Sequence, residues 1–210
     1  GIRTAIDQFK MAVAIEPRFA LAWGQLAAAH AFHALFGFAS PRDSIELARA
    51  AALSAIEADE QFYSGHSALG WARLWTGDFD GACDSFEEAL RLNPSAPDAI
   101  HGEADCLLFD GYPNESVARL RDLKTISPFI AMHNLPLPSH LFVTRRFDEA
   151  IENSEQAEAL FVDGLTHLLA EMGLPQWLQL ILAQGLGGGL QVVATFIPII
   201  TALYLFLSIL

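Results

Sequence analysis

Apolar side chains recur over residues 1–160 at the spacing of amphipathic helices. Over residues 79–92, for example, Ala82, Phe86 and Ala89 lie four and three residues apart and so share one helix face. Proline and glycine interrupt this pattern at intervals and mark helix ends. The pattern predicts helices near residues 2–15, 20–36, 42–58, 62–76, 79–92, 96–110, 114–126 and 147–160.

The helix-face pattern has a 34-residue period. Three aligned positions are small or mostly apolar in successive helices: Ala82, Ser116 and Ala150; Phe86, Leu120 and Ser154; Ala89, Leu123 and Ala157. Pro94 and Pro128 align as well, and a turn precedes each repeat of the pattern at 77–82, 111–116 and 145–150. The chain begins half a repeat out of phase, with Ala5, Phe9, Ala12 and Pro17 at the same relative spacing. Such a period indicates stacked helix pairs, each of which buries its apolar face on a neighbour.

This period, with its small residues, aromatic residue and closing proline, resembles the tetratricopeptide repeat. Trp23, Leu26 and Ala27, and then Leu69 and Gly70, match parts of the signature of that family's first helix. The resemblance covers about residues 1–160. It implies an all-α fold, a right-handed superhelix of antiparallel helix pairs with about four repeats, the last of them degenerate. It also implies a concave face, lined by the first helix of each repeat, that takes a peptide or partner helix.

Two segments depart from the repeat. Residues 129–144 should form a damaged helix, because Pro136 and Pro138 stand where a regular repeat has a continuous helix and each costs about 3 kcal/mol in a helix interior. The second repeat is too long between His30 and Ala48. Residues 36–43 are the expected loop there, with Ser40 or Asp43 as the cap of the next helix.

The register gives candidates for the partner-binding face: Trp71, Trp75, His101 and Asp105. The alternative is that the two tryptophans are partly core residues, since aromatic side chains are usually buried. One subgroup of the family holds a terminal carboxylate with a clamp of Lys, Arg and Asn. The corresponding positions here are Gly24, Ala28, Ser67 and Trp71, so we do not expect that specificity.

Residues 172–210 contain no charged side chain, so all of the acidic and basic residues lie in 1–171. Residues 190–210 are uncharged and long enough, at about 1.5 Å per residue, to cross a bilayer as a helix. A buried strand pair is the alternative, although strands rarely exceed about eight residues. The stretch 174–186 fits an interfacial helix. We therefore expect membrane attachment through 174–210.

Residues 161–169 and 185–200 carry a second resemblance, to the start of the gate domain in the ferrous iron transport protein B family. The residues that carry the membrane motif are Gly187, Gly188, Gly189, Gln191, Thr195, Phe196 and Pro198. A kinked anchor helix is the alternative interpretation. The sequence contains no GxxxxGK[ST] phosphate loop, and one span cannot enclose a pore. The change of character near residue 160 indicates a fusion or a truncated reading frame, so we consider 161–210 a separate hydrophobic helical segment.

The composition of the chain disfavours several classes of partner and activity. The net charge of −13 disfavours nucleic acid as a partner, because a polyanion requires a basic face. Two cysteines, Cys83 and Cys106, make no disulfide framework and are expected to be small core residues. His30 and His33 share a helix, but a metal site needs three or four convergent ligands. We expect no metal, no cofactor and no enzymatic activity.

These patterns together predict a non-catalytic protein–protein interaction scaffold of the tetratricopeptide type. Its repeat domain is expected in the cytoplasm, attached to a bacterial inner membrane by the C-terminal segment. The alternative is a fragment or regulatory fusion of a ferrous iron transporter.

Overall fold

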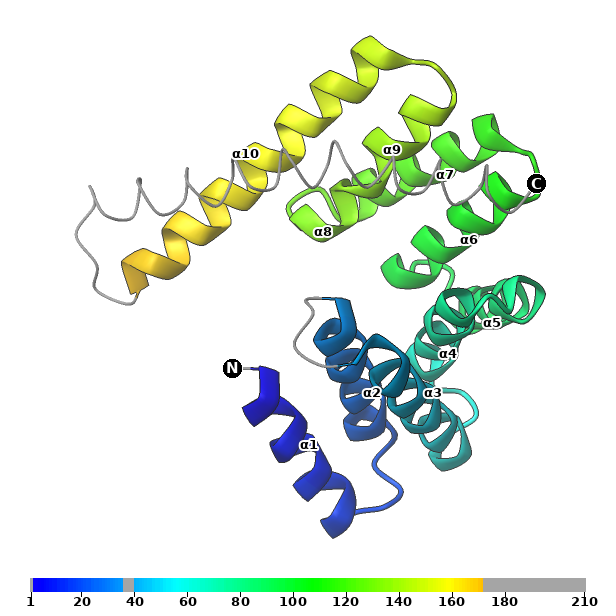
Figure 1. Ribbon diagram of the computed structural model, residues 1–210, viewed down its shortest axis with the longest axis vertical. Helices are drawn as coiled ribbons and strands as arrows, with labels where there is room; N and C mark the ends of the chain where they lie inside the picture. The colour runs from blue at the N-terminus through cyan, green and yellow to red at the C-terminus, as the bar shows by residue number, and fades with distance from the viewer. Residues whose placement is uncertain (1, 36–39, 172–210) are drawn as a thin grey trace. The chain divides into compact units, whose positions relative to one another are not determined.

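The structure, a computed structural model, describes residues 2–35 and 40–171, and every regular element in these two ranges is an α-helix (Figure 1). The helices are α1 (Ile2–Ile15), α2 (Ala20–Leu35), α3 (Pro41–Ala58), α4 (Tyr63–Thr76), α5 (Phe79–Leu92), α6 (Pro97–Phe109), α7 (Pro113–Ile126), α8 (Ala131–Asn134), α9 (Pro136–Val143) and α10 (Phe147–Glu171). The chain divides into two compact units, residues 1–106 and 107–210. The helical periodicity is confirmed: α1 to α7 begin and end within one residue of their predicted bounds. The last helix begins where predicted but continues past residue 160 to Glu171.

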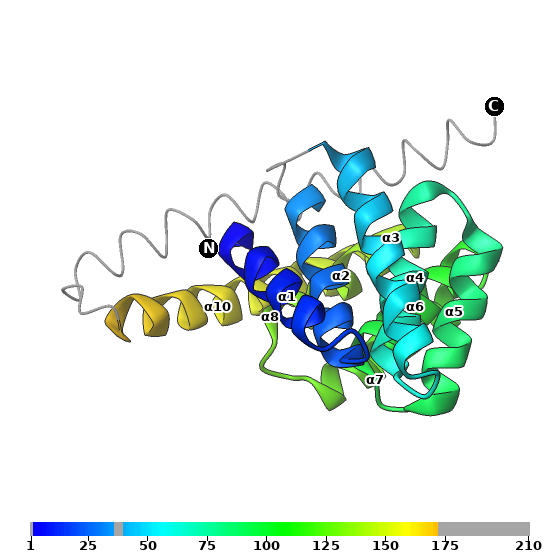
Figure 2. The same ribbon diagram turned by 90° about the horizontal axis from the view of Figure 1, so that it is seen from below.

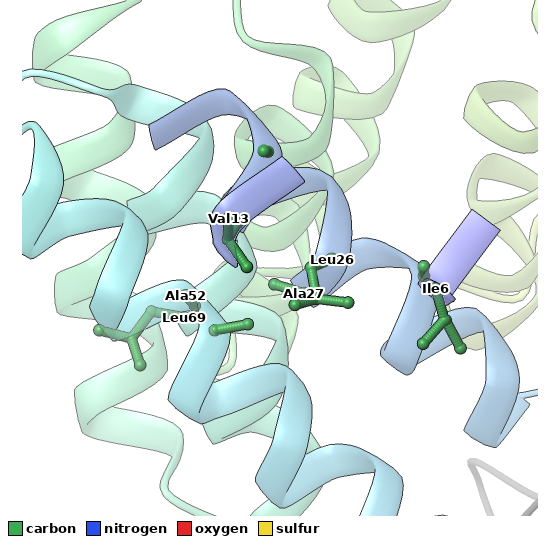
Figure 3. Close-up of a cluster of buried hydrophobic side chains, with 9 residues drawn as sticks. Ile6, Val13, Leu26, Ala27, Ala52 and Leu69 are labelled. Carbon is green, nitrogen blue, oxygen red and sulfur yellow. The ribbon is translucent and has the colours of Figure 1, made fainter. Parts of the chain in front are cut away.

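In the first unit, consecutive helices pack on one another. Contacts join α1 to α2, α2 to α3, α3 to α4 and α4 to α5, and α2 also contacts α4 (Figures 1 and 2). One apolar cluster draws from four helices, with Ile6, Leu26, Ala52 and Leu69 among its buried members (Figure 3). Ala52 and Ala55 on α3 are completely buried. Small residues at these positions let the helix backbones approach closely, and apolar burial of this kind is the main stabilising term.

A second cluster of the first unit surrounds Phe86. Ala82, Phe86 and Ala89 of α5 are all at most 1% exposed and pack with Ala96, Ala99 and Cys106. The Phe86 ring occupies space that two glycines leave, Gly70 on α4 and Gly102 on α6. A Cβ atom on Gly70 would lie only 2.6 Å from Phe86 Cε1. The helix face predicted from the 34-residue register is therefore the buried face of α5.

The two cysteines belong to this cluster and are bonded to each other. Cys106 is 6% exposed and Cys83 packs against the same core, so both are small core residues as expected. They form a disulfide, with their Cα atoms 5.8 Å apart, that joins α5 to α6. This bond was not predicted from the sequence, because two cysteines do not make a framework whose spacing could be recognised.

The backbone repeats with the same period as the side chains. Gly77 and Gly111 adopt positive φ angles of 83° and 84°, and Arg145, one repeat further along, has a φ of 61°. Each of these residues follows the end of a helix, where the chain reverses. Glycine adopts the left-handed conformation without a steric penalty, whereas a residue with a Cβ atom does not. Arg145 therefore adopts a conformation that glycine favours at the two preceding turns.

Replacing Arg145 by glycine should stabilise the second unit by about 0.5–1 kcal/mol. The relief of about 1–2 kcal/mol at the left-handed position outweighs the greater freedom that glycine has in the unfolded chain. The measurement is the urea unfolding midpoint of Arg145→Gly beside that of Arg145→Ala, which removes the same side chain but keeps a Cβ atom. Equal midpoints for the two variants would show that the turn is not strained.

The second unit contains the predicted break in the repeat. Instead of one helix over 129–144 there are two short ones, α8 and α9, and α9 begins at Pro136. Proline is tolerated there because the N–H groups of the first helical turn have no hydrogen-bond partner within the helix, so the helix loses no hydrogen bond when one of them is missing. Ser116 Oγ of α7 and His140 Nδ1 of α9, both buried, lie 2.6 Å apart and are hydrogen-bonded. The damaged helix is thus confirmed, and it still packs on α7.

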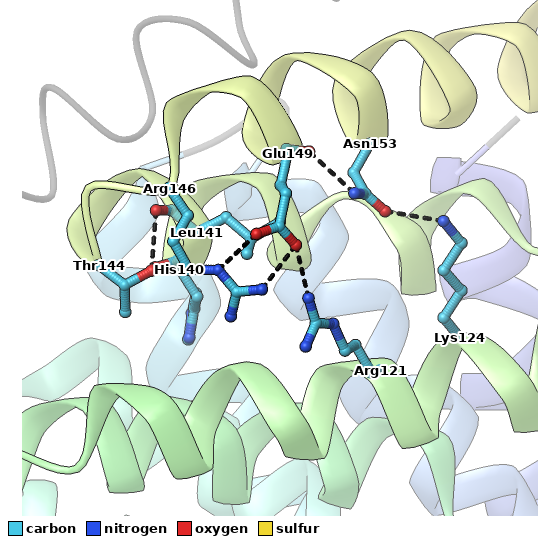
Figure 4. A network of polar contacts seen from close by, with 8 residues as sticks. All are labelled: Arg121, Lys124, His140, Leu141, Thr144, Arg146, Glu149 and Asn153. Carbon is cyan, nitrogen blue, oxygen red and sulfur yellow. Dashed lines mark hydrogen bonds and ion pairs between the residues drawn. The ribbon is translucent and has the colours of Figure 1, made fainter.

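Polar contacts set the position of α10 in the second unit (Figure 4). Glu149 accepts hydrogen bonds from Arg121 of α7 and from Arg146, each at 2.6 Å. Lys124 of α7 donates to Asn153 at 2.7 Å. The Arg146 hydrogen bond, supported by the charges of Arg146 and Arg121, lowers the pKa of Glu149 below its ordinary value. These solvent-accessible contacts add orientation more than stability.

The predicted insertion and tail lie mostly outside the described residues. Ser40 is the N-cap residue of α3 by position, but its side chain makes no capping hydrogen bond. Within 2–35 and 40–171, no helix is long and apolar enough to cross a membrane. The apolar segment 174–210 and the motif residues Gly187, Gly188, Gly189, Gln191, Thr195, Phe196 and Pro198 are outside those ranges.

Candidate functional site

The four predicted partner-binding residues lie on two helices of the first unit. Trp71 and Trp75 are on α4, and His101 and Asp105 are on α6. A spacing of four residues places the members of each pair on one face of their helix, one turn apart. We call these four residues the α4/α6 surface.

Three of these residues are brought together by direct contacts. The rings of Trp71 and His101 have centroids 4.7 Å apart and meet edge to face. His101 Nε2 lies 3.8 Å from Asp105 Oδ2, and the two side chains are 25% and 18% exposed. Trp71 also packs edge to face on Phe86, with ring centroids 5.2 Å apart. The α4/α6 surface therefore rests directly on the Phe86 core.

The two tryptophans differ in their surroundings. Trp71 is half-buried against the Phe86 cluster, whereas Trp75 is 38% exposed. A large aromatic side chain with this exposure can desolvate against a partner, because it is already fixed on a helix and buries a large area at little entropic cost. Trp71 is thus partly a core residue, and Trp75 is the tryptophan that a partner can reach.

The charges near this surface are segregated. Helix α2 contains no Asp, Glu, Lys or Arg, and α4 contains only Arg73, whereas α6 contains Asp98, Glu103 and Asp105. The Arg73 guanidinium is directed to α5, where it donates to the Gly81 carbonyl at 2.9 Å and to Ser85 Oγ at 2.8 Å. The charged side chains that α6 carries are therefore acidic, and the one cation of α4 is engaged on the neighbouring helix.

A cavity of about 430 Å³ in the first unit was not anticipated from the sequence. Its charged and titratable lining residues are Arg3, Asp7, Lys10, His30, His33 and Asp43. His30 is only 5% exposed, and its burial, together with Lys10 and His33, lowers its pKa. The two acidic and two basic side chains balance, so the lining favours no single class of ligand. Among the described residues, no three His, Cys, Asp or Glu side chains are grouped so that they could hold a metal ion.

No periodic signal in the sequence marks this cavity. Its lining residues come from α1, α2 and the start of α3, and they do not share the 34-residue register. The α4/α6 surface, in contrast, follows from that register, because α4 and α6 begin one repeat apart, at Tyr63 and Pro97.

Comparison with known proteins supports the repeat assignment. Residues 63–96, which comprise α4 and α5, match the tetratricopeptide repeat family. The structure is similar to that of TTC0263, a thermophilic TPR protein of Thermus thermophilus, with a TM-score of 0.56 and 21% sequence identity. This similarity covers 67% of the present chain and 73% of TTC0263, and it shows a shared fold.

A short stretch of the chain is similar to iron transporters. It is 48% identical over 50 residues to the Fe(2+) transporter FeoB of Escherichia coli (strain K12) and 42% identical over 53 residues to that of Legionella pneumophila (strain Lens). These matches include about a quarter of the chain but only 6–7% of the transporters' length. The chain thus carries a tetratricopeptide repeat at residues 63–96, and its described part has the helical fold of tetratricopeptide repeat proteins.

Proposed function

We propose that this protein is a non-catalytic interaction scaffold and that its α4/α6 surface binds a protein or peptide partner. The observation that carries the proposal is the exposure of Trp75 one helical turn from the contact between Trp71 and His101. Tryptophan is enriched among the residues that dominate binding energy in interfaces. An exposed tryptophan on the same surface as the His101–Asp105 pair offers an apolar anchor together with orienting polar groups.

The repeat architecture supports the same surface. Because α4 and α6 are the first helices of successive 34-residue units, the same positions of each helix face the same way within the first unit. Stacked repeats present such faces as a continuous binding surface, and this is why helical-repeat proteins serve so widely as scaffolds.

The proposal is tested by recovery of partners from the native cells on the tagged full chain. Trp75→Ala should reduce recovery of the specific partner by about tenfold or more, because interface tryptophans commonly contribute at least about 2 kcal/mol. Its helicity and unfolding midpoint should remain close to those of the wild type. Leu53→Ala is the matched control, because it truncates another exposed apolar residue, on α3, the second helix of its helix pair. This variant should leave recovery unchanged. Equal recovery on all three proteins would refute the α4/α6 surface.

Membrane attachment through 174–210 is a separate part of the proposal and rests on the uncharged sequence. A chain that ends before residue 172 should move from the membrane fraction to the supernatant. The disulfide bears on the compartment of the repeats, because such bonds persist in oxidising compartments and are rare in the cytosol. Alkylation of Cys83 and Cys106 in intact cells distinguishes the cytosol from an oxidising compartment. Modified thiols place the repeats in the cytoplasm, and thiols protected by the disulfide place them outside it.

The ferrous iron transporter alternative is not favoured. Its support is a match of 50–53 residues that spans 6–7% of the transporters, so their activity does not follow for this chain. If 161–210 did take part in transport, its deletion would lower iron uptake. We expect uptake to be unchanged.

A further inference from the structure

We propose that the partner segment bound at the α4/α6 surface is cationic, with Lys or Arg side chains placed beside apolar ones. This inference rests on the proposed function and specifies the chemistry of the partner. It is carried by the segregation of charge among the helices α2, α4 and α6 and by the exposure of Trp75 on the same surface.

The charge distribution disfavours an acidic partner at this surface. An acidic peptide or a terminal carboxylate needs cations at the binding face, yet among the helices α2, α4 and α6 the only Lys or Arg is Arg73. Its guanidinium is occupied by the Gly81 carbonyl and Ser85 Oγ, and it lies 3.6 Å from Asp78 Oδ2. An acidic segment at this surface would lose its hydration and meet further carboxylates. Like charges in apposition oppose binding strongly.

Two of the carboxylates of α6 share one face of the helix. Asp98 and Asp105 are seven residues apart and so lie on the same helix face, about 10 Å apart along the axis. Asp98 is exposed, and Asp105 lies beside the contact between His101 and Trp71. In a peptide with the polyproline II conformation, residues three apart point to the same side and are separated by about 9 Å. The spacing therefore suits basic side chains at positions i and i+3 of a segment in the polyproline II conformation.

Trp75 adds a second mode of recognition for the same partner. An ammonium or guanidinium group binds over the face of an indole ring, and the aliphatic stems of Lys and Arg pack on it. Neutral apolar residues of the segment would pack on Trp75 and on the exposed edge of Trp71. The net charge of −13 of the whole chain adds a long-range attraction for a cationic segment.

The experiment is a selection from a random displayed peptide library on the immobilised full chain, followed by affinity measurements. Selected peptides should be enriched in Lys and Arg. The best of them should bind Asp98→Asn/Asp105→Asn about tenfold more weakly than the wild type, and with a shallower salt dependence. The matched control is Asp84→Asn/Glu87→Gln on α5, which removes the same charge from exposed positions of a second helix and should change the affinity less than about twofold.

Two results separate this inference from the proposed function. If the selected peptides are neutral or acidic and still depend on Trp75, the scaffold remains and the cationic partner is wrong. If no selected peptide depends on Trp75, both proposals fail. Equal losses in the α6 and α5 charge variants would also overturn the inference, because they would reduce it to a non-specific effect of net charge.

Discussion

Gly102→Ala is expected to destabilise the first unit by about 1–3 kcal/mol, against the usual direction of such a change. In a helix interior, alanine is normally about 1 kcal/mol more favourable than glycine. Here the added Cβ atom would overlap the Phe86 ring, which touches the position it would occupy. Phe86 is 1% exposed and packed on several sides, so its ring has little room to move. Overpacking therefore outweighs helix propensity.

A double-mutant cycle with Phe86→Leu tests the cause of that loss. Leucine at position 86 costs stability by itself, but it removes the ring atoms that the new methyl group meets. The cost of Gly102→Ala should then fall by about 1 kcal/mol or more, since contacting residues couple whereas distant ones add. Chemical denaturation of the four proteins measures the coupling. A Gly102→Ala variant that is as stable as the wild type, or that costs the same in both backgrounds, would contradict the proposed packing.

Loss of the disulfide is the second large effect. Cys83 and Cys106 are 23 residues apart, and closing a loop of this length restricts the unfolded chain by about 3 kcal/mol in the chain-entropy account. The Cys83→Ala/Cys106→Ala variant, and the wild type in reductant, should therefore unfold at clearly lower denaturant concentrations. Both residues lie in the Phe86 core, so the double variant also loses some packing.

Unfolding in the presence of reductant separates the contribution of the disulfide to stability from that of the packing of the two side chains. Reductant should lower the unfolding midpoint of the wild type and leave that of the double alanine variant unchanged. A wild type whose midpoint does not respond to reductant, and which titrates two free thiols in the unfolded state, would show that the bond does not form.

Local periodicity explains why the helices could be predicted from the sequence and the bond could not. The spacing of Ala82, Phe86 and Ala89 concerns residues close along the chain, and it places all three on one face of α5, which the structure shows to be buried, without any knowledge of the neighbouring helices. The disulfide depends on which turn of α6 lies beside Cys83, and this is a property of packing between helices. The residue type of Arg145 gives no sign of its left-handed backbone, although the 34-residue register aligns it with Gly77 and Gly111.

The site shows the same division. A spacing of four places Trp71 and Trp75 on one face of α4, so the sequence could nominate both but could not rank them. The contacts of Trp71 with Phe86 and His101 separate the two residues and leave Trp75 as the accessible one. The sequence shows that α4 has one cationic side chain, Arg73, and that the charged side chains of α6 are acidic. Only the structure shows that Arg73 is hydrogen-bonded to α5.

The central claim, that the first helices of the repeats form the partner-binding surface, is tested most directly by site-specific photocrosslinking in cells. A photoreactive phenylalanine derivative at position 75 of α4, which keeps a large aromatic ring in place of Trp75, is compared with the same amino acid at position 87 of α5, which is also exposed. The α4/α6 surface predicts a discrete protein adduct at position 75 that is absent at position 87. Adducts at position 87 but not at 75, or none at 75 under conditions in which the partner co-purifies, would contradict it.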